Sequence, residues 1–143
     1  MTPRTDDGST TPLVLGLFLI AASFVVVAAA VTSLHLDRLR LLTLADGAAL
    51  AAAESFALDD VEVRDGTVVP VLRADAVRST AAEHLAASDT SAFPDLALTG
   101  AATPDGERAS VTLTATWRPP VVSALLPVGV PLTVTSTAGA RFR

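Results

Sequence analysis

The chain has 143 residues, of which half are hydrophobic, with a mean hydropathy of +0.52 and a formal net charge of −5. This length allows one modest domain and a membrane anchor, and the scattered acidic residues leave no basic face for nucleic-acid phosphates, which argues against nucleic-acid binding. Cysteine is absent, which excludes disulfides, thiolate catalysis and cysteine-based zinc sites.

The hydrophobic excess is concentrated near the N-terminus. Residues 13–34, LVLGLFLIAASFVVVAAAVTSL, carry no charge, and about 20 apolar residues suffice to span the hydrocarbon core of a bilayer. Thr11 followed by Pro12 favours a helix start, because a hydroxyl can cap free N–H groups and proline sacrifices no hydrogen bond in the first turn. The sequence therefore predicts a cytoplasmic segment or short leader over residues 1–11 and a transmembrane helix over residues 12–35.

This apolar run has three interpretations. It can be a secretory signal cleaved after Ala30, although Asp6 and Asp7 and the length of the run argue against that. It can be an uncleaved single-pass anchor. It can also be a pilin-type helix that stays on the mature protein after a short leader ending at Gly8 is removed.

The helical pattern continues beyond the apolar run, over residues 36–57. Apolar residues recur there at three- and four-residue steps, and only Gly47 is expected to allow a kink. An uncovered alanine-rich surface of this length would leave too much apolar area in water. We therefore predict a packing face, covered by a sheet or by a partner, that consists of Ala45, Ala49, Ala52, Ala53 and Phe56.

The segments DGSTTPLVLGLFL, DRLRLL and ADGAALAAAESF, in this order around the long apolar helix, resemble the N-terminal region of the TadE/TadG-like proteins of bacterial Tad (Flp) pilus assembly. The resemblance covers residues 7–57. It implies a pilin-like plan, in which the part of the first helix beyond the membrane packs against an antiparallel sheet. It also implies other pilin or pilus-assembly subunits as partners.

The resemblance further implies a candidate leader cleavage between Gly8 and Ser9. Cleavage there would make Leu13 the fifth mature residue, where pilin-type proteins usually have glutamate, and the residue before Gly8 is the acidic Asp7. These two departures slightly favour an uncleaved anchor.

The remaining residues, 58–143, predict an extracytoplasmic α+β domain. Alternating valines around Asp65-Gly66 indicate a hairpin, residues 73–88 have helical spacing, and residues 95–118 indicate a second hairpin with PDGE at its tip. Residues 131–142 alternate as a last strand. The proline-rich stretch before them cannot be a central strand, and its apolar residues, Val121, Val122, Leu125 and Leu126, are expected to cap the core or to touch a membrane or partner.

No pattern in the sequence indicates catalysis. His35 and His84 lack partners at metal-ligand spacing, and the acids between Asp59 and Asp65 do not match a calcium loop. Phosphate-binding and nucleophile motifs are absent. We therefore predict no enzyme, no cofactor, no metal and no small-molecule substrate.

Together with the predicted anchor, the resemblance implies a structural component of a Tad/Flp-type pilus or related secretion assembly, a membrane-anchored minor pilin or pseudopilin-like protein with its N-terminus in the cytoplasm and its domain outside. Flanking charge slightly favours the opposite orientation, but a folded domain of about 100 residues can be translocated largely regardless of charge. The expected partners are the lipid bilayer and other pilus subunits. The alternative is a secreted binding domain whose signal is removed after Ala30.

Overall fold

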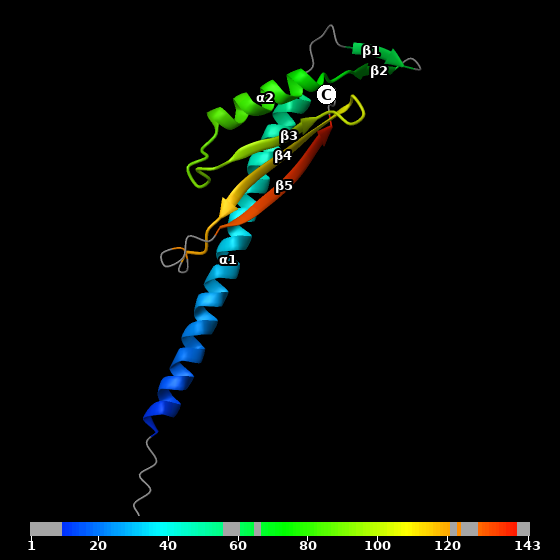
Figure 1. Cartoon of the computed structure of the whole chain (residues 1–143). Coiled ribbons are helices and arrows are strands. Elements are labelled where there is room, and N and C mark those ends of the chain that lie inside the picture. The colour runs from blue at the N-terminus through cyan, green and yellow to red at the C-terminus, as the bar shows by residue number, and fades with distance from the viewer. Residues whose placement is uncertain (1–9, 56–60, 65–66, 121–122, 124–128, 140–143) are drawn as a thin grey trace, which may run out of the picture.

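The computed structural model describes residues 10–55, 61–64, 67–120, 123 and 129–139. Figure 1 shows one long helix that runs the length of the molecule, with the other labelled elements gathered around its C-terminal half. The predicted α+β class, with a long apolar N-terminal helix, one further helix and an antiparallel sheet, is confirmed. The elements in chain order are α1 (Thr11–Ala53), β1 (Val61–Arg64), β2 (Thr67–Pro70), α2 (Ala74–Ala87), β3 (Ala97–Ala102), β4 (Arg108–Trp117) and β5 (Val130–Gly139).

α1 is continuous over 43 residues, because alanine and leucine are strong helix formers and its one proline lies in the first turn. The helix continues through Gly47, where a kink was expected. The predicted hydroxyl cap at Thr11 is wrong: Thr10 is the N-cap residue and its side chain makes no capping hydrogen bond. The helix ends at Ala53 instead of near residue 56, and the Ser55 hydroxyl donates to the Ala52 carbonyl over 2.7 Å.

The two halves of α1 have different surroundings. In the N-terminal half large apolar side chains are bare, with Leu13, Phe18 and Phe24 exposed by 75%, 67% and 72%. The most apolar window of the helix has no residue buried within the structure, and by length and composition it can cross a membrane. From Leu41 onward one face of the helix is completely buried. α1 therefore consists of an exposed apolar half, here called the rod (residues 12–35), and a half that forms part of the domain core (from Leu41).

The strands β3, β4 and β5 form an antiparallel sheet with β4 in the centre. Thr114 of β4 pairs with Ala97 of β3 on one side and with Thr133 of β5 on the other. A register shift between Leu98 and Gly100 marks a bulge in β3. Along β4, buried and half-buried residues alternate strictly, as expected for a sheet with one face on the core and one face in water.

The wet face of this sheet is rich in hydroxyls that pair with one another. The hydroxyls of Thr112 and Thr135 lie 2.9 Å apart, and those of Thr114 and Thr133 lie 3.2 Å apart. Thr99 continues the row on β3, 3.2 Å from Thr114. Threonine suits such a position, because its branched Cβ favours a strand and its hydroxyl is satisfied across the ladder.

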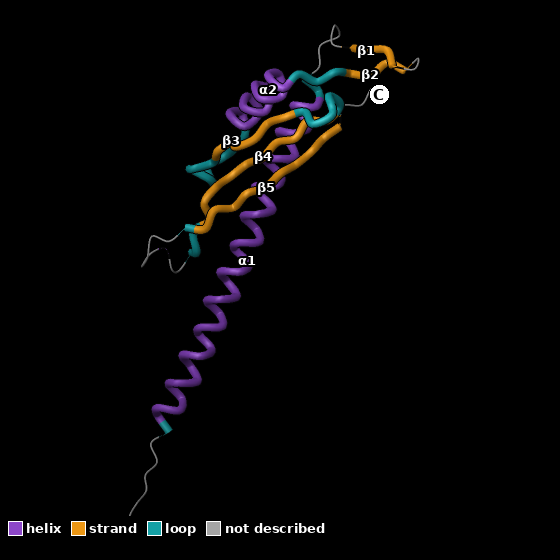
Figure 2. Tube along the Cα trace, turned by 45° about the vertical axis from the view of Figure 1, so that its right-hand side comes forward, coloured by secondary structure: helices purple, strands orange, loops and turns teal. Residues whose placement is uncertain are grey.

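The core lies where the sheet and α2 meet α1. Figure 2 shows the three-stranded sheet lying along α1, with α2 beside it, and α1 packs against β4, β5 and α2. The buried residues of this core are Leu41, Ala45, Ala48, Ala49, Ala52, Ala53, Leu72, Val77, Ala81, Leu85, Phe93, Ala109, Val111, Leu113, Ala115 and Val134.

The predicted first hairpin is present but separate. β1 and β2 form their own two-stranded sheet, in a register from Val61 opposite Pro70 to Arg64 opposite Thr67. Figure 1 shows the hairpin extending away from the three-stranded sheet at the end of the molecule remote from the start of α1. The turn expected at residues 65–66 lies outside the described residues.

The connection from β4 to β5 is described at residues 118–120, 123 and 129. Pro119 accepts a hydrogen bond from the Ser123 N–H over 3.0 Å. Pro131 is the second residue of β5, an edge strand, where a missing N–H is tolerated. The apolar residues of this connection that were expected to cap the core or to touch a membrane or partner lie outside the described residues: Val121, Val122, Leu125 and Leu126.

Candidate helix-packing site

Four of the five residues predicted to form a packing face, Ala45, Ala49, Ala52 and Ala53, are completely buried on α1. The fifth, Phe56, lies outside the described residues, as do the candidate cleavage residues Gly8 and Ser9. Steps of three and four residues put the four alanines on one side of the helix. Because alanine ends at Cβ, this side lets another backbone approach closely.

Leu41 and Ala48 belong to the same face and are also completely buried, although the sequence analysis did not single out either as a packing residue. Their signal was present, since Leu41 lies four residues before Ala45 and Ala48 lies four residues before Ala52. The face is covered by β4, β5 and α2 of the same chain. The alanine-rich segment is therefore part of the domain core.

A close approach of the two helices accounts for Gly47. A Cβ atom at this position would lie 2.8 Å from Nε2 of His84 on α2, so the absence of a side chain on Gly47 gives the imidazole its space. His84 was expected on a helix surface, and it is half-buried there. The sequence offered no signal for this contact, because it depends on how two helices cross.

Polar contacts fasten both ends of the sheet to α1. Near the end of α1, the Ser136 hydroxyl of β5 donates to Oδ1 of Asp46. At the other end, Nε1 of Trp117, the last residue of β4, donates to Oγ of Ser33 over 3.4 Å. Trp117 is only 8% exposed. This second contact joins the folded domain to the charge-free stretch of the helix.

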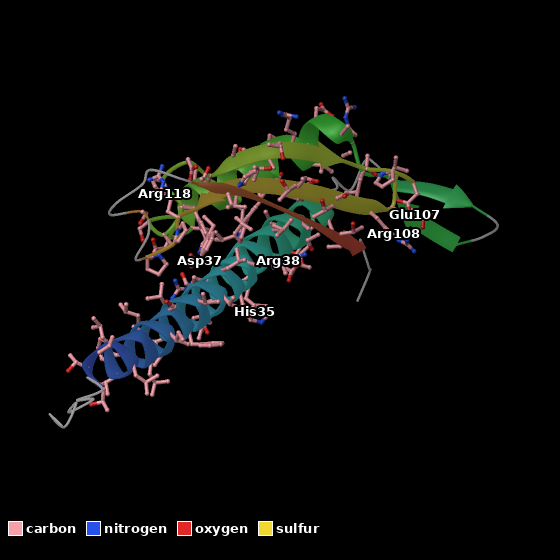
Figure 3. All side chains as sticks on the ribbon, turned by 60° about the horizontal axis from the view of Figure 1, so that its bottom comes forward. His35, Asp37, Arg38, Glu107, Arg108 and Arg118 are labelled. Atoms are coloured by element: carbon pink, nitrogen blue, oxygen red, sulfur yellow. The ribbon has the colours of Figure 1, made fainter. Side chains whose placement is uncertain are left out.

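Charged residues follow that stretch directly. Arg40 and Asp37 form an ion pair of 3.3 Å one turn apart, whereas His35 and Arg38 are exposed. Figure 3 shows Arg118 at one end of the sheet and Glu107 and Arg108 at the other.

Asp95 fixes the segment before β3 to the end of β4. Its Oδ1 accepts a hydrogen bond from the Thr116 N–H over 3.3 Å. Hydrogen bonding from Thr116, and more weakly the charge of Arg118, lowers the pKa of Asp95 below 3.8. The carboxylate is therefore ionised at neutral pH and acts as a structural acceptor.

Nothing among the described residues forms a reactive constellation. No group of three or more His, Asp or Glu side chains there could hold a metal ion. An open groove between α2 and β3 is lined by apolar and hydroxyl side chains, among them Leu85, Phe93 and Leu98, and by no titratable group.

Comparison with known proteins gives one family. Residues 8–55 match the family described as putative Flp pilus-assembly TadE/G-like. No curated protein and no solved structure gives a significant match. The matched segment begins at the candidate cleavage residue Gly8 and ends just beyond α1, so it covers the whole helix with its bare and packed halves. The match confirms the resemblance predicted from the sequence: residues 8–55 are similar to the TadE/TadG-like family of Flp pilus assembly.

Proposed function

We propose that the chain is a single-pass membrane protein that acts structurally, as a minor pilin or pseudopilin-like subunit of a Tad (Flp) pilus or a related secretion assembly. In this proposal the first residues lie in the cytoplasm, residues 12–35 cross the membrane and the domain that follows α1 lies outside. The match over residues 8–55 supports a role in pilus assembly.

The observation that carries the proposal is the division of α1 into two halves. One face of the C-terminal half is covered by the chain's own sheet and second helix. The N-terminal half keeps its large apolar side chains bare. Exposure of such surface to water costs about 25 cal/mol per Å², so its surroundings must be lipid or other apolar helices.

A bare apolar helix tied to a self-contained domain suits a subunit that moves between two surroundings. In the membrane, lipid covers residues 12–35. In a filament or an assembly platform, the corresponding helices of neighbouring subunits cover them instead. In lipid, helix association depends on close packing and not on a hydrophobic force, so the exchange costs little.

Site-specific crosslinking from the bare helix tests this function. A photo-reactive residue replaces Leu17, which is 68% exposed, and the matched control carries it at Glu107, at the far end of the sheet. We expect crosslinks from position 17 to other pilus or pilus-assembly subunits, in the membrane or sheared-filament fraction. Two results together would refute the pilus role. They are crosslinks from position 17 to lipid alone, and normal pili in cells from which the gene for this chain has been deleted.

N-terminal sequencing separates this proposal from the alternative of a secreted domain. A mature chain that begins at Met1 or Ser9 retains the membrane helix and agrees with the proposal. A soluble chain that begins at Val31 has lost it and would establish the secreted domain.

A further inference from the structure

One end of the three-stranded sheet lies level with the end of the charge-free stretch of α1. Trp117, the last residue of β4, pairs with Val130, the first residue of β5. Its indole N–H donates to Ser33, and the next charged residues of α1 are Asp37 and Arg38. The contact therefore fixes where this strand end stands along the helix.

The rise of α1 gives the depth of Ser33 relative to a bilayer that the helix spans. At about 1.5 Å per residue, the helix rises about 32 Å from Pro12 to Ser33, close to the roughly 30 Å of a bilayer's hydrocarbon core. When this stretch spans a membrane, Ser33 stands at the outer boundary of the hydrocarbon. Trp117 must then lie at that boundary too, because its indole N–H is hydrogen-bonded to Ser33.

The strand end has the chemistry of a membrane interface. Val130 is 44% exposed, and Arg118, Pro120 and Pro131 are also exposed. Arginine concentrates where apolar and wet layers meet, because its guanidinium can reach lipid phosphate. Trp117 is only 8% exposed and donates its N–H to Ser33, so it fixes the position of this strand end.

We propose that this membrane-facing end, formed by Trp117, Arg118, Pro120, Val130 and Pro131, rests in the interfacial layer of the bilayer that α1 spans. Val130 contacts the upper acyl carbons and Arg118 binds lipid phosphate. The domain is then held by two attachments, the helix and the strand end, which fix the rotation of α1 about its own axis. The inference rests on the membrane-spanning role proposed for α1, and not on the pilus role.

The experiment uses the natural absence of cysteine from the chain. Single-cysteine variants of the full chain, Val130→Cys, Glu107→Cys and Phe18→Cys, carry an environment-sensitive fluorophore in phospholipid vesicles. Glu107→Cys is the matched control, because Glu107 is exposed at the opposite end of the sheet. Phe18→Cys reports whether α1 is inserted. Each is quenched in turn by lipids with a spin label near the headgroup, by lipids with a spin label deep in the chain, and by aqueous iodide.

We expect the label at residue 130 to lose most of its emission to the shallow spin label and little to iodide. The label at residue 107 should show the reverse. The label at residue 18 should respond to the deep spin label. Trp117, the only tryptophan, gives a readout without any substitution: lipids brominated near the headgroup should quench it more than lipids brominated at the chain end.

Two results would overturn the inference. If the label at residue 130 responds to iodide as residue 107 does, while residue 18 is quenched from within the bilayer, the strand end stands in water and only α1 is anchored. If residue 130 is shielded from iodide and also from the lipid labels, protein covers it. Loss of the residue 18 signal would instead refute insertion of α1, which the proposed function requires, so the two failures are distinguishable.

Discussion

Gly47 has no side chain, and this allows α1 and α2 to approach each other closely. At Gly47 a Cβ atom would meet Nε2 of His84 at 2.8 Å, a distance shorter than normal contact. Glycine in a helix interior costs about 1 kcal/mol relative to alanine, because it leaves the unfolded chain more freedom. The close contact with His84 gives that cost a structural reason.

A double-mutant cycle tests this pairing. In the wild-type background Gly47→Ala should gain little stability, because the new methyl group displaces the imidazole. In a His84→Ala background the same change should stabilise the domain by about 1 kcal/mol, the helix-propensity term alone. Urea unfolding of the four proteins gives the coupling. Equal gains in both backgrounds would show that His84 moves aside without cost.

An aspartate organises the turn between β3 and β4. Oδ1 of Asp105 accepts hydrogen bonds from the N–H groups of Glu107 and Arg108, at 3.0 and 2.8 Å, and Gly106 between them has a φ of +78°. The Glu107 N–H first, and then the N–H and charge of Arg108, lower the pKa of Asp105 below 3.8. Hydrogen bonding likewise lowers the pKa of Asp75, Asp89 and Asp95.

These shifts predict the direction of the pH dependence of stability. A carboxyl whose pKa is lower in the folded state contributes stability above its unfolded pKa, about 3.9, and loses it as the pH falls through the folded pKa. The free energy of unfolding should therefore decrease below about pH 4. Asp105→Asn should make this decrease shallower, measured by urea unfolding from about pH 6 downward. An unchanged acid profile in Asp105→Asn would show that the turn hydrogen bonds do not depend on charge.

At the scale of elements, the organising contact is the alanine face of α1 under the sheet. Five alanines of this face, Ala45, Ala48, Ala49, Ala52 and Ala53, are completely buried, and β4, β5 and α2 pack against α1. Close packing of this kind has no spare volume, because protein interiors are filled to the density of organic crystals. The small side chains are therefore required by the distance between the sheet and the helix axis.

Ala49→Leu should destabilise the domain by about 1–3 kcal/mol through overpacking. Thr43→Leu is the matched control, since it enlarges an exposed position on the same helix and should change stability by less than about 0.5 kcal/mol. Chemical denaturation followed by Trp117 fluorescence measures both. If Ala49→Leu unfolds like the wild type but fails to join other pilus subunits, the face is covered by a partner and not by the sheet.

The sequence predicted these elements better than it predicted their contacts. Hydrophobic periodicity identified both helices and all five strands, because each pattern is local. It missed Ala48 as a packing residue, and it could not reveal the contact of Trp117 with Ser33, which lie 84 residues apart. Contacts between distant segments depend on the packing of many residues at once. Local sequence patterns therefore do not reveal which surfaces meet.

The N-cap of α1 is a case in which a local prediction was wrong. Thr11 had the right chemistry for an N-cap, but α1 begins at Thr11 and its N-cap residue, Thr10, makes no side-chain bond. Helix ends are decided by small free-energy differences, so one residue of displacement is normal. The candidate cleavage residues Gly8 and Ser9 stay predictions, since they lie outside the described residues.

The whole molecule consists of a domain with a complete core and a rod that needs other surroundings. Among the residues that the structure describes, those of the buried core all lie at or after Leu41, and the bare apolar side chains are concentrated before Leu34. We therefore expect folding of the domain and insertion of the N-terminal half of α1 to be separable in energy.

A fragment of residues 31–143 tests that separation. It keeps Ser33 and the entire buried core, so we expect it to stay in solution without detergent and to unfold cooperatively, with the near-ultraviolet circular dichroism of Trp117 preserved. The full chain should require detergent or lipid. A fragment that lacks fixed near-ultraviolet signal and cooperative unfolding would show that the membrane helix also stabilises the domain.

The position of β5 has a consequence for export. This strand supplies one neighbour of the central strand and part of the cover of α1, yet it is the last element to leave the translocation channel if the domain is delivered outward behind its anchor. Until it arrives, the part of the α1 face that β5 covers is bare and β4 has an open edge. The contacts of β5 with α1 close loops of about 90 residues, which is slow. In that order of export, the domain core therefore closes only after β5 has emerged.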